Sequence, residues 1–273
     1  MTINLRNDRS LFKVSGPDAH KLLNDVFTGT IPEKSGDAHW WALLSPQGKI
    51  QAEGLISLHK EAYWLDVNVD ASPKFFKRMG MYKLRADAII QDMSETYCVG
   101  WAPNSSQNFA DKDQRQEQLG FRIIALKTET GSWEQTSAAY QKNRSRLGIP
   151  ELGIDFASDS LFPHDIGMDL LKGVDFSKGC YVGQEVVSRM RHKANVRRRP
   201  VIVETGGPGM GEILLNDKTV GQIGPVTDGI GVGIVRLDRI GDPEAATIEG
   251  HKAKLSIPSW ADYDFASNSN PDK

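Results

Sequence analysis

The pattern of the sequence changes near residue 200, and this change constrains the fold more than any other feature. Before it, segments with helical periodicity alternate irregularly with short apolar segments. From Pro200 to Pro258 the chain is rich in Gly, Val and Ile, turn signals follow one another closely, and no helix-length pattern occurs. This pattern is typical of a small all-β domain, for which we predict a partial barrel.

The part before residue 200 contains three longer segments with helical character. The segment 15–29 has an apolar stripe, with Ser15 placed to cap the helix and Gly29 to end it. The segment 72–90 predicts a helix that runs into a strand, and the segment 136–150 predicts another helix, ended by glycine and proline. Helices and strands alternate too irregularly for a doubly wound parallel sheet.

Strands are predicted between these helices. Residues 45–48, "SPQG", are a strong turn signal between two strands, and the segment 62–70 alternates like a strand with one buried face. Two more strands, 96–102 and 121–127, flank the polar stretch 103–118, which we interpret as a surface excursion. Since several strand pairs look like hairpins, we predict an α+β protein with mainly antiparallel sheets.

We divide the 273 residues into three parts. Residues 1–199 are predicted to hold two interleaved α+β subdomains, and residues 200–260 a C-terminal β-barrel domain. The polar residues 261–273 are predicted to be a disordered tail. The chain is long enough for the first two parts to bury a core.

The charge and cysteine content exclude several classes of protein. The net charge is −2 and the pI is near 6.3, so any anion site has to come from local clustering of basic residues. Two cysteines cannot make a disulfide framework, and they are too few to hold an iron–sulfur cluster by thiolates alone. Because no signal peptide and no membrane-spanning stretch is seen, we expect a soluble protein of the cytoplasm. In a eukaryote the mitochondrial matrix is the alternative, although no transit peptide is seen.

The stretch "FSKGCYVGQE", residues 176–185, gives one cysteine unusual neighbours. Lys178 precedes Cys180, Gly179 allows unusual backbone conformations, and the segment 183–190 predicts a short helix whose N-terminus faces the cysteine. Positive charge and backbone N–H groups lower the pKa of a thiol, so one interpretation is an exposed, activated thiol. The other is a small core side chain in a tight turn, where most free cysteines belong.

The basic run after this stretch also has two interpretations. Runs such as 189–199 most often form a solvated surface, but the position next to the cysteine loop suits an anion site for a polyanionic small molecule. An RNA site is disfavoured because no aromatic residues are interleaved. We find no metal constellation, since His164 and Asp165 are adjacent and point apart, and interpret 229–233, "GIGVG", as a turn and Cys98 as a core residue.

Residues 161–199 carry a resemblance to a known family. They resemble the signature region of the YgfZ-type folate-binding proteins, relatives of the glycine-cleavage T-protein, whose hallmark is K-G-C-Y-x-G-Q-E. Lys178 to Glu185 match this motif at every fixed position. Matching stretches elsewhere are "VSGPDAHKLL" (14–23), "LSPQGKI" (44–50), "MYKLRADAII" (81–90) and "RSRLGIPELG" (144–153).

The resemblance implies a fold and a function. The implied fold is a T-protein-like multi-domain ring around a central folate channel, which binds a tetrahydrofolate-type ligand, with a small C-terminal β-barrel domain. The implied function is assembly or repair of iron–sulfur clusters in client enzymes, one of them active in tRNA modification, by a non-enzymatic or accessory maturation factor with a transferase-like fold; whether it has catalytic turnover is left open. The implied partners are iron–sulfur assembly proteins and their clients, with which a transient cluster is shared. Nucleic-acid and membrane binding are not expected, and the chain is expected to be a monomer.

The resemblance also implies which residues form the site. It places the Cys180 loop on the channel wall near the pterin, with Cys180 and Lys178 as catalytic residues, and aligns Tyr140 with an aromatic position of the folate site. A pterin needs a carboxylate partner, which Asp165 or Glu185 can supply, and the carboxylates of a folate tail pair well with arginines. The residues implied to bind folate are Tyr140, Arg144, Asp165, Gly179, Tyr181, Gly183, Gln184, Glu185, Arg189 and Arg191, with Arg146 as a further candidate.

The sequence departs from the family's pattern at two places, and two alternative functions stay open. The family's usual step after the first helix reads Thr-Gly-Thr at 28–30, and its usual His-Arg-Gly reads His-Lys-Ala at 192–194. One alternative is an aminomethyltransferase that passes a one-carbon unit to tetrahydrofolate; of the acidic pair that T-proteins carry, only Glu53 is present, longer by a methylene. The other is a tRNA-associated binding protein that uses the basic run.

Overall fold

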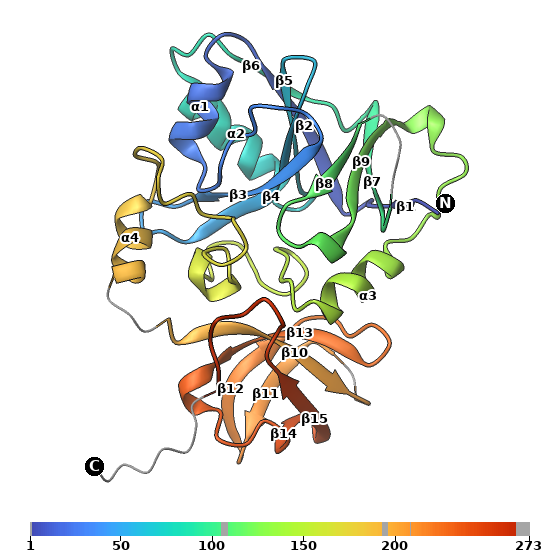
Figure 1. The fold of residues 1–273 in the computed structure, drawn as a ribbon, viewed down its shortest axis with the longest axis vertical. Helices are drawn as coiled ribbons and strands as arrows, with labels where there is room; N and C mark the ends of the chain where they lie inside the picture. Colours follow the sequence, from blue (N-terminus) through green and yellow to red (C-terminus); the bar gives the residue numbers. More distant parts are fainter. Residues whose placement is uncertain (1, 105–108, 193–195, 208, 266–273) are drawn as a thin grey trace.

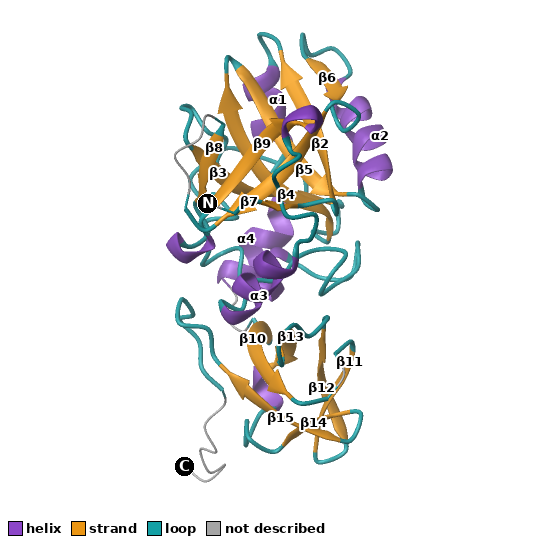
Figure 2. Cartoon of the chain, turned by 90° about the vertical axis from the view of Figure 1, so that its right-hand side faces the viewer, coloured by secondary structure: helices purple, strands orange, loops and turns teal. Residues whose placement is uncertain are grey.

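The structure, a computed structural model, describes residues 2–104, 109–192, 196–207 and 209–265. Figures 1 and 2 show two parts: an α+β part that holds the first nine strands and a β-barrel below it that holds the last six. Helices α3 (Ala138–Arg146) and α4 (Gln184–His192), with the loops next to them, lie between the two parts. No described helix is long and apolar enough to cross a membrane.

A mainly antiparallel sheet forms the α+β part. Its strand order is β1-β7-β9-β8-β3-β4-β5-β2-β6, and the pairing of β3 with β8 is parallel while the others that the structure describes are antiparallel. This confirms the predicted fold class. The strands are β1 (Asn4–Leu5), β2 (Arg9–Ser15), β3 (Asp37–Leu44), β4 (Ile50–His59), β5 (Ala62–Asn68), β6 (Ile89–Asp92), β7 (Tyr97–Ala102), β8 (Ala110–Asp113) and β9 (Phe121–Leu126).

Helices α1 (Ala19–Val26) and α2 (Ser72–Lys83) cover one face of this sheet (Figure 1). Leu23 of α1 and Phe75 and Met79 of α2 are buried in the main hydrophobic core, so each helix turns one apolar face to the sheet. Strand β6 follows α2, in agreement with the predicted run from helix into strand.

The start and the end of α1 differ from the prediction. Ser15 is the last residue of β2 rather than the helix cap, and Asp18 takes the N-cap position. Gly16 lies between them at φ +110°, and an added Cβ there would come within 2.6 Å of a backbone oxygen, so this glycine turn sets where the helix begins. At the other end Phe27 rather than Gly29 is the C-cap residue.

Strand β5 is buried along its whole length, so the prediction of one solvated face is wrong. Leu65 and Val67 pack into the core that the helices cover. Trp64 faces the other side of the sheet, where it packs against residues of β7 and β9, and Asp66 pairs with an arginine of β9. A strand in the middle of a sheet that is covered on both faces has no solvated side.

The prediction of a surface excursion at 103–118 is corrected for part of the stretch. Residues 103, 104, 117 and 118 are exposed, as expected, but several others are buried, and residues 105–108 lie outside the described residues. The stretch contains β8, and the side chains of Asp113 and Arg115 within it are buried. The helix predicted at 136–150 is present as α3, and Gly148 follows it at φ +66°, in the left-handed conformation that ends many helices.

Six strands form a closed barrel in the order β10-β13-β12-β11-β14-β15. The predicted partial barrel is corrected to a closed one, because β15 pairs with β10 and leaves no open edge. Val201, Val203, Val235 and Ile248 belong to its own hydrophobic core. The strands are β10 (Arg198–Thr205), β11 (Gly211–Leu215), β12 (Lys218–Ile223), β13 (Ile230–Arg236), β14 (Ala246–Ile248) and β15 (His251–Ser256).

Two smaller segments complete the barrel part. Of the predicted turn 229–233 only Gly229, at φ +77°, lies in the turn, since β13 begins at the next residue. In the segment predicted as a tail, the Tyr263 hydroxyl donates a hydrogen bond to the Pro200 carbonyl oxygen at 2.8 Å, so the chain still packs on the barrel there. Residues 266–273 lie outside the described residues.

Candidate functional site

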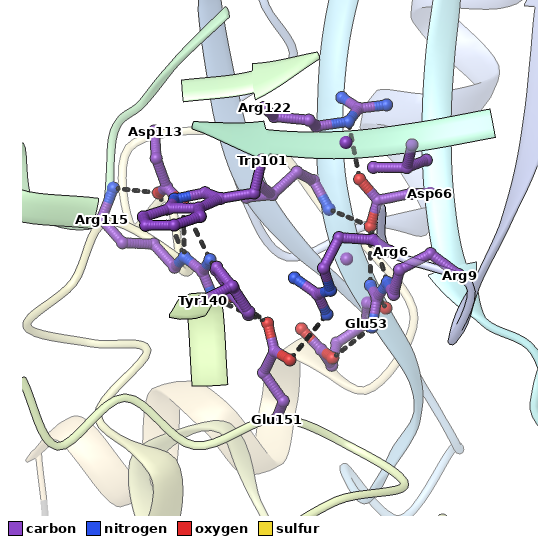
Figure 3. Close-up of a pocket in the computed structure, with 14 residues that line it drawn as sticks. Arg6, Arg9, Glu53, Asp66, Trp101, Asp113, Arg115, Arg122, Tyr140 and Glu151 are labelled. Atoms are coloured by element: carbon purple, nitrogen blue, oxygen red, sulfur yellow. Dashed lines mark hydrogen bonds and ion pairs between the residues drawn. The ribbon is translucent and has the colours of Figure 1, made fainter. Parts of the chain in front are cut away.

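Buried charged side chains gather where the first strands meet the loop after α3 (Figure 3). They come from five strands, from helix α3 and from loops distant in sequence, so the fold rather than the local sequence assembles them. None of these side chains is more than 7% exposed. We call them the central cluster, which consists of Arg6, Arg9, Glu53, Asp66, Asp113, Arg115, Arg122, Arg144, Glu151 and Asp155.

Glu151 lies at the centre of this cluster. One of its carboxylate oxygens accepts a hydrogen bond from Arg6 Nη2 at 2.9 Å, and the other accepts one from the Tyr140 hydroxyl. Burial raises the pKa of Glu151, but Arg6, Arg144 and the other arginines outweigh it, so the pKa lies below its ordinary value. Burial and the Glu151 charge raise the pKa of Tyr140 to about 12, which keeps the phenol protonated and able to donate.

Glu53, the carboxylate considered for aminomethyl transfer, is fully engaged. Its Oε2 accepts a hydrogen bond from Trp40 Nε1 at 2.6 Å, and its Oε1 accepts from Leu152 N at 3.3 Å and Arg9 Nη1 at 3.4 Å. Its side chain is 1% exposed. In this conformation Glu53 acts as a structural acceptor and has no open path to a substrate amine.

Asp66 joins two strands of the sheet through two arginines. Its oxygens lie 2.7 Å from Arg9 Nη2 and 2.7 Å from Arg122 Nε. Burial opposes ionisation of Asp66, but the charges of Arg122 and Arg9 prevail and hold its pKa below the ordinary value. The pair of arginines therefore keeps a buried carboxylate charged between β2, β5 and β9.

The cavity enclosed by the central cluster is small. Its volume is about 20 Å³, which is room for one water molecule. Pockets for organic ligands span about 300–1,000 Å³. The residues present therefore do not fit a pterin ring in this conformation, because their own side chains fill the space.

The motif loop, residues 178–185, lies apart from the central cluster and leads into α4. Lys178 Nζ donates a hydrogen bond to the Gly29 carbonyl oxygen at 2.9 Å, and Tyr181 is buried, so two side chains anchor the loop to the α+β part. Burial lowers the pKa of Lys178 to about 8, against the attraction of Asp175. The same burial raises the pKa of Tyr181 to about 12.

Cys180 is exposed between these anchors. The carbonyl oxygen of Gly179, the residue before it, accepts a hydrogen bond from Gln184 Nε2 at 3.3 Å. Gly183 has φ +81°, and an added Cβ would lie 2.9 Å from the Ser45 carbonyl oxygen, so glycine is required at this close approach. The anchored backbone thus presents the thiol to solvent. The cysteine is therefore exposed, as in the interpretation of an exposed, activated thiol, and is not a core side chain.

Four polar side chains of α4 contact one another or the loop: Gln184, Glu185, Arg189 and Arg191. Glu185 and Arg189 form an exposed ion pair at 2.6 Å, one helical turn apart. The Arg191 guanidinium lies over the Phe176 ring, 4.0 Å from its centre. These arginines are on the outer side of the molecule and not in the central cluster.

The predicted folate residues are not gathered in one site: most lie either with the central cluster or in the motif loop and α4. Tyr140 and Arg144 belong with the central cluster, while none of the 14 residues that line its cavity lies in the motif loop. Asp165 is in neither place: it caps a short 3-10 turn, where its Oδ2 accepts a hydrogen bond from Phe162 N at 3.0 Å. Burial raises the pKa of Asp165. The Arg146 side chain is exposed.

The basic run 189–199 is dispersed rather than gathered on one face. Arg199 is buried and pairs with both oxygens of Asp169, at 2.7 and 2.9 Å. Arg198 is exposed on β10, and residues 193–195, which include the departure at Ala194, lie outside the described residues. Within the described ranges, no three His, Cys, Asp or Glu side chains are grouped so as to hold a metal ion.

Sequence analysis missed most of the central cluster. Arg6, Asp66, Asp113, Arg115 and Arg122 were not singled out, because each is one charge in an otherwise ordinary segment. A signal was present at Asp66 and Arg122, which are single charges inside apolar strand segments, "YWLDV" and "FRIIAL". A buried charge needs a partner, so such positions predict an ion pair but do not say with whom.

The barrel matches a known family. Residues 197–263 match the family described as "CAF17, C-terminal beta-barrel domain". The match covers the closed barrel and the segment that packs on it.

Similar proteins of known name are iron–sulfur cluster assembly factors. The chain is 29% identical over 214 residues to the mitochondrial iron–sulfur cluster assembly factor IBA57 homolog of Pyricularia oryzae, covering 70% of this chain and 54% of that protein. It is 32% identical over 235 residues to the Chaetomium globosum homolog, covering 71% and 54%. It is 23% identical over 303 residues to human IBA57, covering 92% and 83%. The chain spans about half the length of the fungal relatives.

The fold as a whole resembles a solved T-protein. The chain aligns with the glycine cleavage system aminomethyltransferase T from Bartonella henselae with a TM-score of 0.69 and 12% sequence identity, over 97% of this chain and 87% of that one. At this identity the likeness concerns the fold, which agrees with the predicted T-protein-like architecture with a C-terminal barrel.

Proposed function

We propose that the chain is a member of the YgfZ- and IBA57-type branch of the T-protein superfamily and that it acts in the assembly or repair of iron–sulfur clusters. The observation that carries the proposal is the similarity to proteins named as iron–sulfur cluster assembly factors, joined to an exposed cysteine on an anchored loop. In this proposal the chain is an accessory factor, the cluster is its cargo, and assembly proteins and client enzymes are its partners.

Cys180 is the residue proposed to contact the cluster. Its thiol is exposed, whereas Cys98 is buried and burial raises its pKa, which disfavours the thiolate that a cluster needs. One cysteine supplies one ligand, and the described residues contain no metal-binding group of three His, Cys, Asp or Glu. The remaining ligands therefore have to come from a partner, so the proposed state is a transient cluster shared between two proteins.

The central cluster favours this role over aminomethyl transfer. A transferase needs an accessible carboxylate near the amine of its substrate, and Glu53 is held by three hydrogen bonds and is 1% exposed. A role in direct tRNA binding gains no support either, since Arg189 and Arg199 of the basic run are each paired with a carboxylate.

The proposed role is tested by a matched pair of cysteine variants. Cys180→Ser is expected to abolish complementation of a strain that lacks this protein, measured as the activity of an iron–sulfur client enzyme in extracts. Cys98→Ser is expected to retain complementation, and both variants should give the thermal unfolding curve of a folded protein. Full client activity with the Cys180→Ser protein would remove the thiol from the proposal. Full client activity in the strain without any form of the protein would remove the role itself.

Reduced folate is a separate part of the proposal, and no step of the cluster role depends on it. Because the central cavity has a volume of about 20 Å³, folate can bind there only if ion pairs of the central cluster separate. Calorimetry with tetrahydrofolate is the test: we expect measurable binding and a rise in the melting temperature. If neither heat nor stabilisation is found, folate is not a ligand of this chain.

The names of the relatives bear on location. The fungal and human proteins are named mitochondrial, which supports the mitochondrial alternative, while the expectation of a cytoplasmic protein has no support from them. We propose that the chain acts where its clients acquire clusters. A fluorescent fusion in the source cells, scored against mitochondrial and cytoplasmic markers, is expected to follow the client enzymes.

A further inference from the structure

A second cavity lies where the α+β part meets the barrel. Its volume is about 390 Å³, within the range of small-molecule pockets. Its walls are residues 155–157, 160 and 161 of the loop after α3 and residues of strands β12 and β13, with one residue from the start of β10 and Arg239 from the 3-10 turn after β13. We call it the junction cavity. It shares no residue with the KGCYVGQE loop and does not enter the proposed function.

Three arginines line the junction cavity: Arg198, Arg236 and Arg239. Arg198 and Arg236 are direct partners across the antiparallel pair of β10 and β13. Like charges placed opposite each other on neighbouring strands are unfavourable, and the carboxylate that pairs with Arg236, Asp238, offsets this repulsion only in part.

A fourth cation lies at the edge of the cavity. Lys49 Nζ donates a hydrogen bond to the carbonyl oxygen of Ser160, which is one of the lining residues, at 2.9 Å. Burial lowers the pKa of Lys49 against the attraction of Asp165, and the charge of Arg198 also lowers it, so Lys49 lies near a second cation as well as a carboxylate. Basic side chains are thus concentrated at this cavity, although the whole chain has a net charge of −2.

The nearby carboxylates cancel only part of this charge. Asp165 attracts Lys49 and Arg198, but it is not a lining residue and its Oδ2 accepts a hydrogen bond from Phe162 N. Asp155 is the acidic member of the 13 lining residues, and its Oδ2 is committed to Arg144 Nη1 at 2.6 Å. Asp238 pairs with Arg236 at 2.7 Å but is not a lining residue.

Among the described residues, Arg198 makes no ion pair within 4.0 Å. Arg239 makes no ion pair among the described residues either, although its Nη1 donates a hydrogen bond to the Thr219 carbonyl oxygen at 3.2 Å. The guanidinium groups of Arg198 and Arg239 therefore remain without a carboxylate partner.

The remaining wall of the junction cavity is apolar. Phe156, Leu161, Val220 and Ile234 line it, and each is between 4% and 9% exposed. Apolar surface beside a few charged groups is the composition of sites that hold an organic molecule in one orientation. A bare inorganic ion would use the arginines and leave this wall unused.

We propose that the junction cavity binds a small organic molecule that carries several oxyanion charges, as phosphate or carboxylate groups, next to an apolar ring. The guanidinium groups of Arg198 and Arg239 pair with the oxyanions, and the wall formed by Phe156, Leu161, Val220 and Ile234 contacts the ring. Since the loop 155–161 and the barrel both form walls, the ligand holds the two parts of the chain together.

Calorimetry at low ionic strength tests this site, with AMP, inorganic pyrophosphate and citrate as probes. We expect saturable binding of AMP or citrate to the wild-type chain, and about a tenfold weaker binding after Arg198→Gln or Arg239→Gln. The matched control is Arg197→Gln, which removes the same charge from an exposed neighbour that does not line the cavity, and we expect less than a twofold change. Thermal unfolding verifies that each variant is folded.

The outcomes separate the parts of the proposal. Preference for AMP or for citrate identifies the oxyanion as phosphate or carboxylate, and tighter binding of AMP than of pyrophosphate supports the apolar contact. Equal affinity for AMP and pyrophosphate overturns the apolar contact. Absence of saturable binding by all three probes, or equal weakening in the Arg197→Gln control, overturns the site. None of these results depends on Cys180, so they are independent of the cluster role.

Discussion

The central cluster and the junction cavity use the same residue type in opposite ways. In the central cluster each arginine faces a carboxylate, and the cavity that remains has a volume of about 20 Å³. In the junction cavity three arginines surround about 390 Å³, and two of them face each other across paired strands. A guanidinium group that has a buried carboxylate is part of the structure, whereas one that faces open space and another cation is available to a ligand.

Asp155 connects the two regions. It lines the junction cavity, yet its carboxylate pairs with Arg144 of the central cluster. Burial raises the pKa of Asp155, against the charge of Arg144, so this carboxylate is held charged at some cost. The comparison therefore predicts that substitutions in the central cluster lower the stability of the chain, whereas substitutions of the junction-cavity arginines weaken anion binding.

The largest loss of stability is expected from a substitution of Glu151. Glu151→Gln leaves Arg6 and Arg144 with one buried carboxylate fewer, and breaking a buried ion pair of this kind costs about 3–5 kcal/mol. Chemical denaturation should show a lower midpoint at an unchanged slope. Glu185→Gln, which breaks the exposed pair with Arg189, is the control and should cost less than about 1 kcal/mol. Equal costs for the two variants would mean that the central cluster does not hold the fold together.

A substitution of Asp155 is expected to have a smaller effect on stability and also to change anion binding in the junction cavity. Asp155→Asn removes the carboxylate at 2.6 Å from Arg144 and should destabilise the chain by about 1–3 kcal/mol. The same change makes the junction cavity more positive, so pyrophosphate or citrate should bind more tightly than to the wild type. Asp159→Asn, at an exposed pair with Lys74, should change neither quantity. Loss of stability without any change in anion binding would separate the two regions.

The central cluster also predicts a pH dependence. The pKa values of Glu151 and Asp66 are lowered from 4.5 and 3.8, so their contribution to stability is complete above these values and is lost as the pH falls below them. We expect constant stability from these groups between pH 7 and 5, and a decline below about pH 4.5. Asp155 and Asp165, whose pKa values are raised, act in the opposite direction. Urea midpoints measured against pH check this, and Glu151→Gln should flatten the decline.

The smallest effect is expected at Arg198. Arg198→Gln relieves the repulsion with Arg236, so stability should stay the same or rise by up to about 0.5 kcal/mol in the absence of a ligand. Thermal unfolding in a buffer free of phosphate and citrate measures this. A clear loss of stability would show that Arg198 has a structural partner and does not wait for an anion, which would contradict the comparison.

Much of the fold could be predicted from local patterns. Turn signals such as "SPQG", the helical periodicity of α3 and the dense turns after residue 200 reflect interactions between neighbours in sequence, and the structure has the hairpin, the helix and the barrel. The predictions that were wrong concern long-range contacts. They are the burial of both faces of β5, the buried residues within 103–118, and the closure of the barrel by β15.

The candidate site divides in the same way. The motif from Lys178 to Glu185 is readable in sequence, as is the need for glycine at Gly183, because both are local. The partners of the charged residues are not readable, because Arg6 and Glu151 are 145 positions apart and the pairing depends on how strands pack. The sequence by itself thus determined the fold class and an unusual cysteine loop. Only the tertiary structure decided which arginines are neutralised and which remain for a ligand, since charge pairing is a matter of distance in space and of burial.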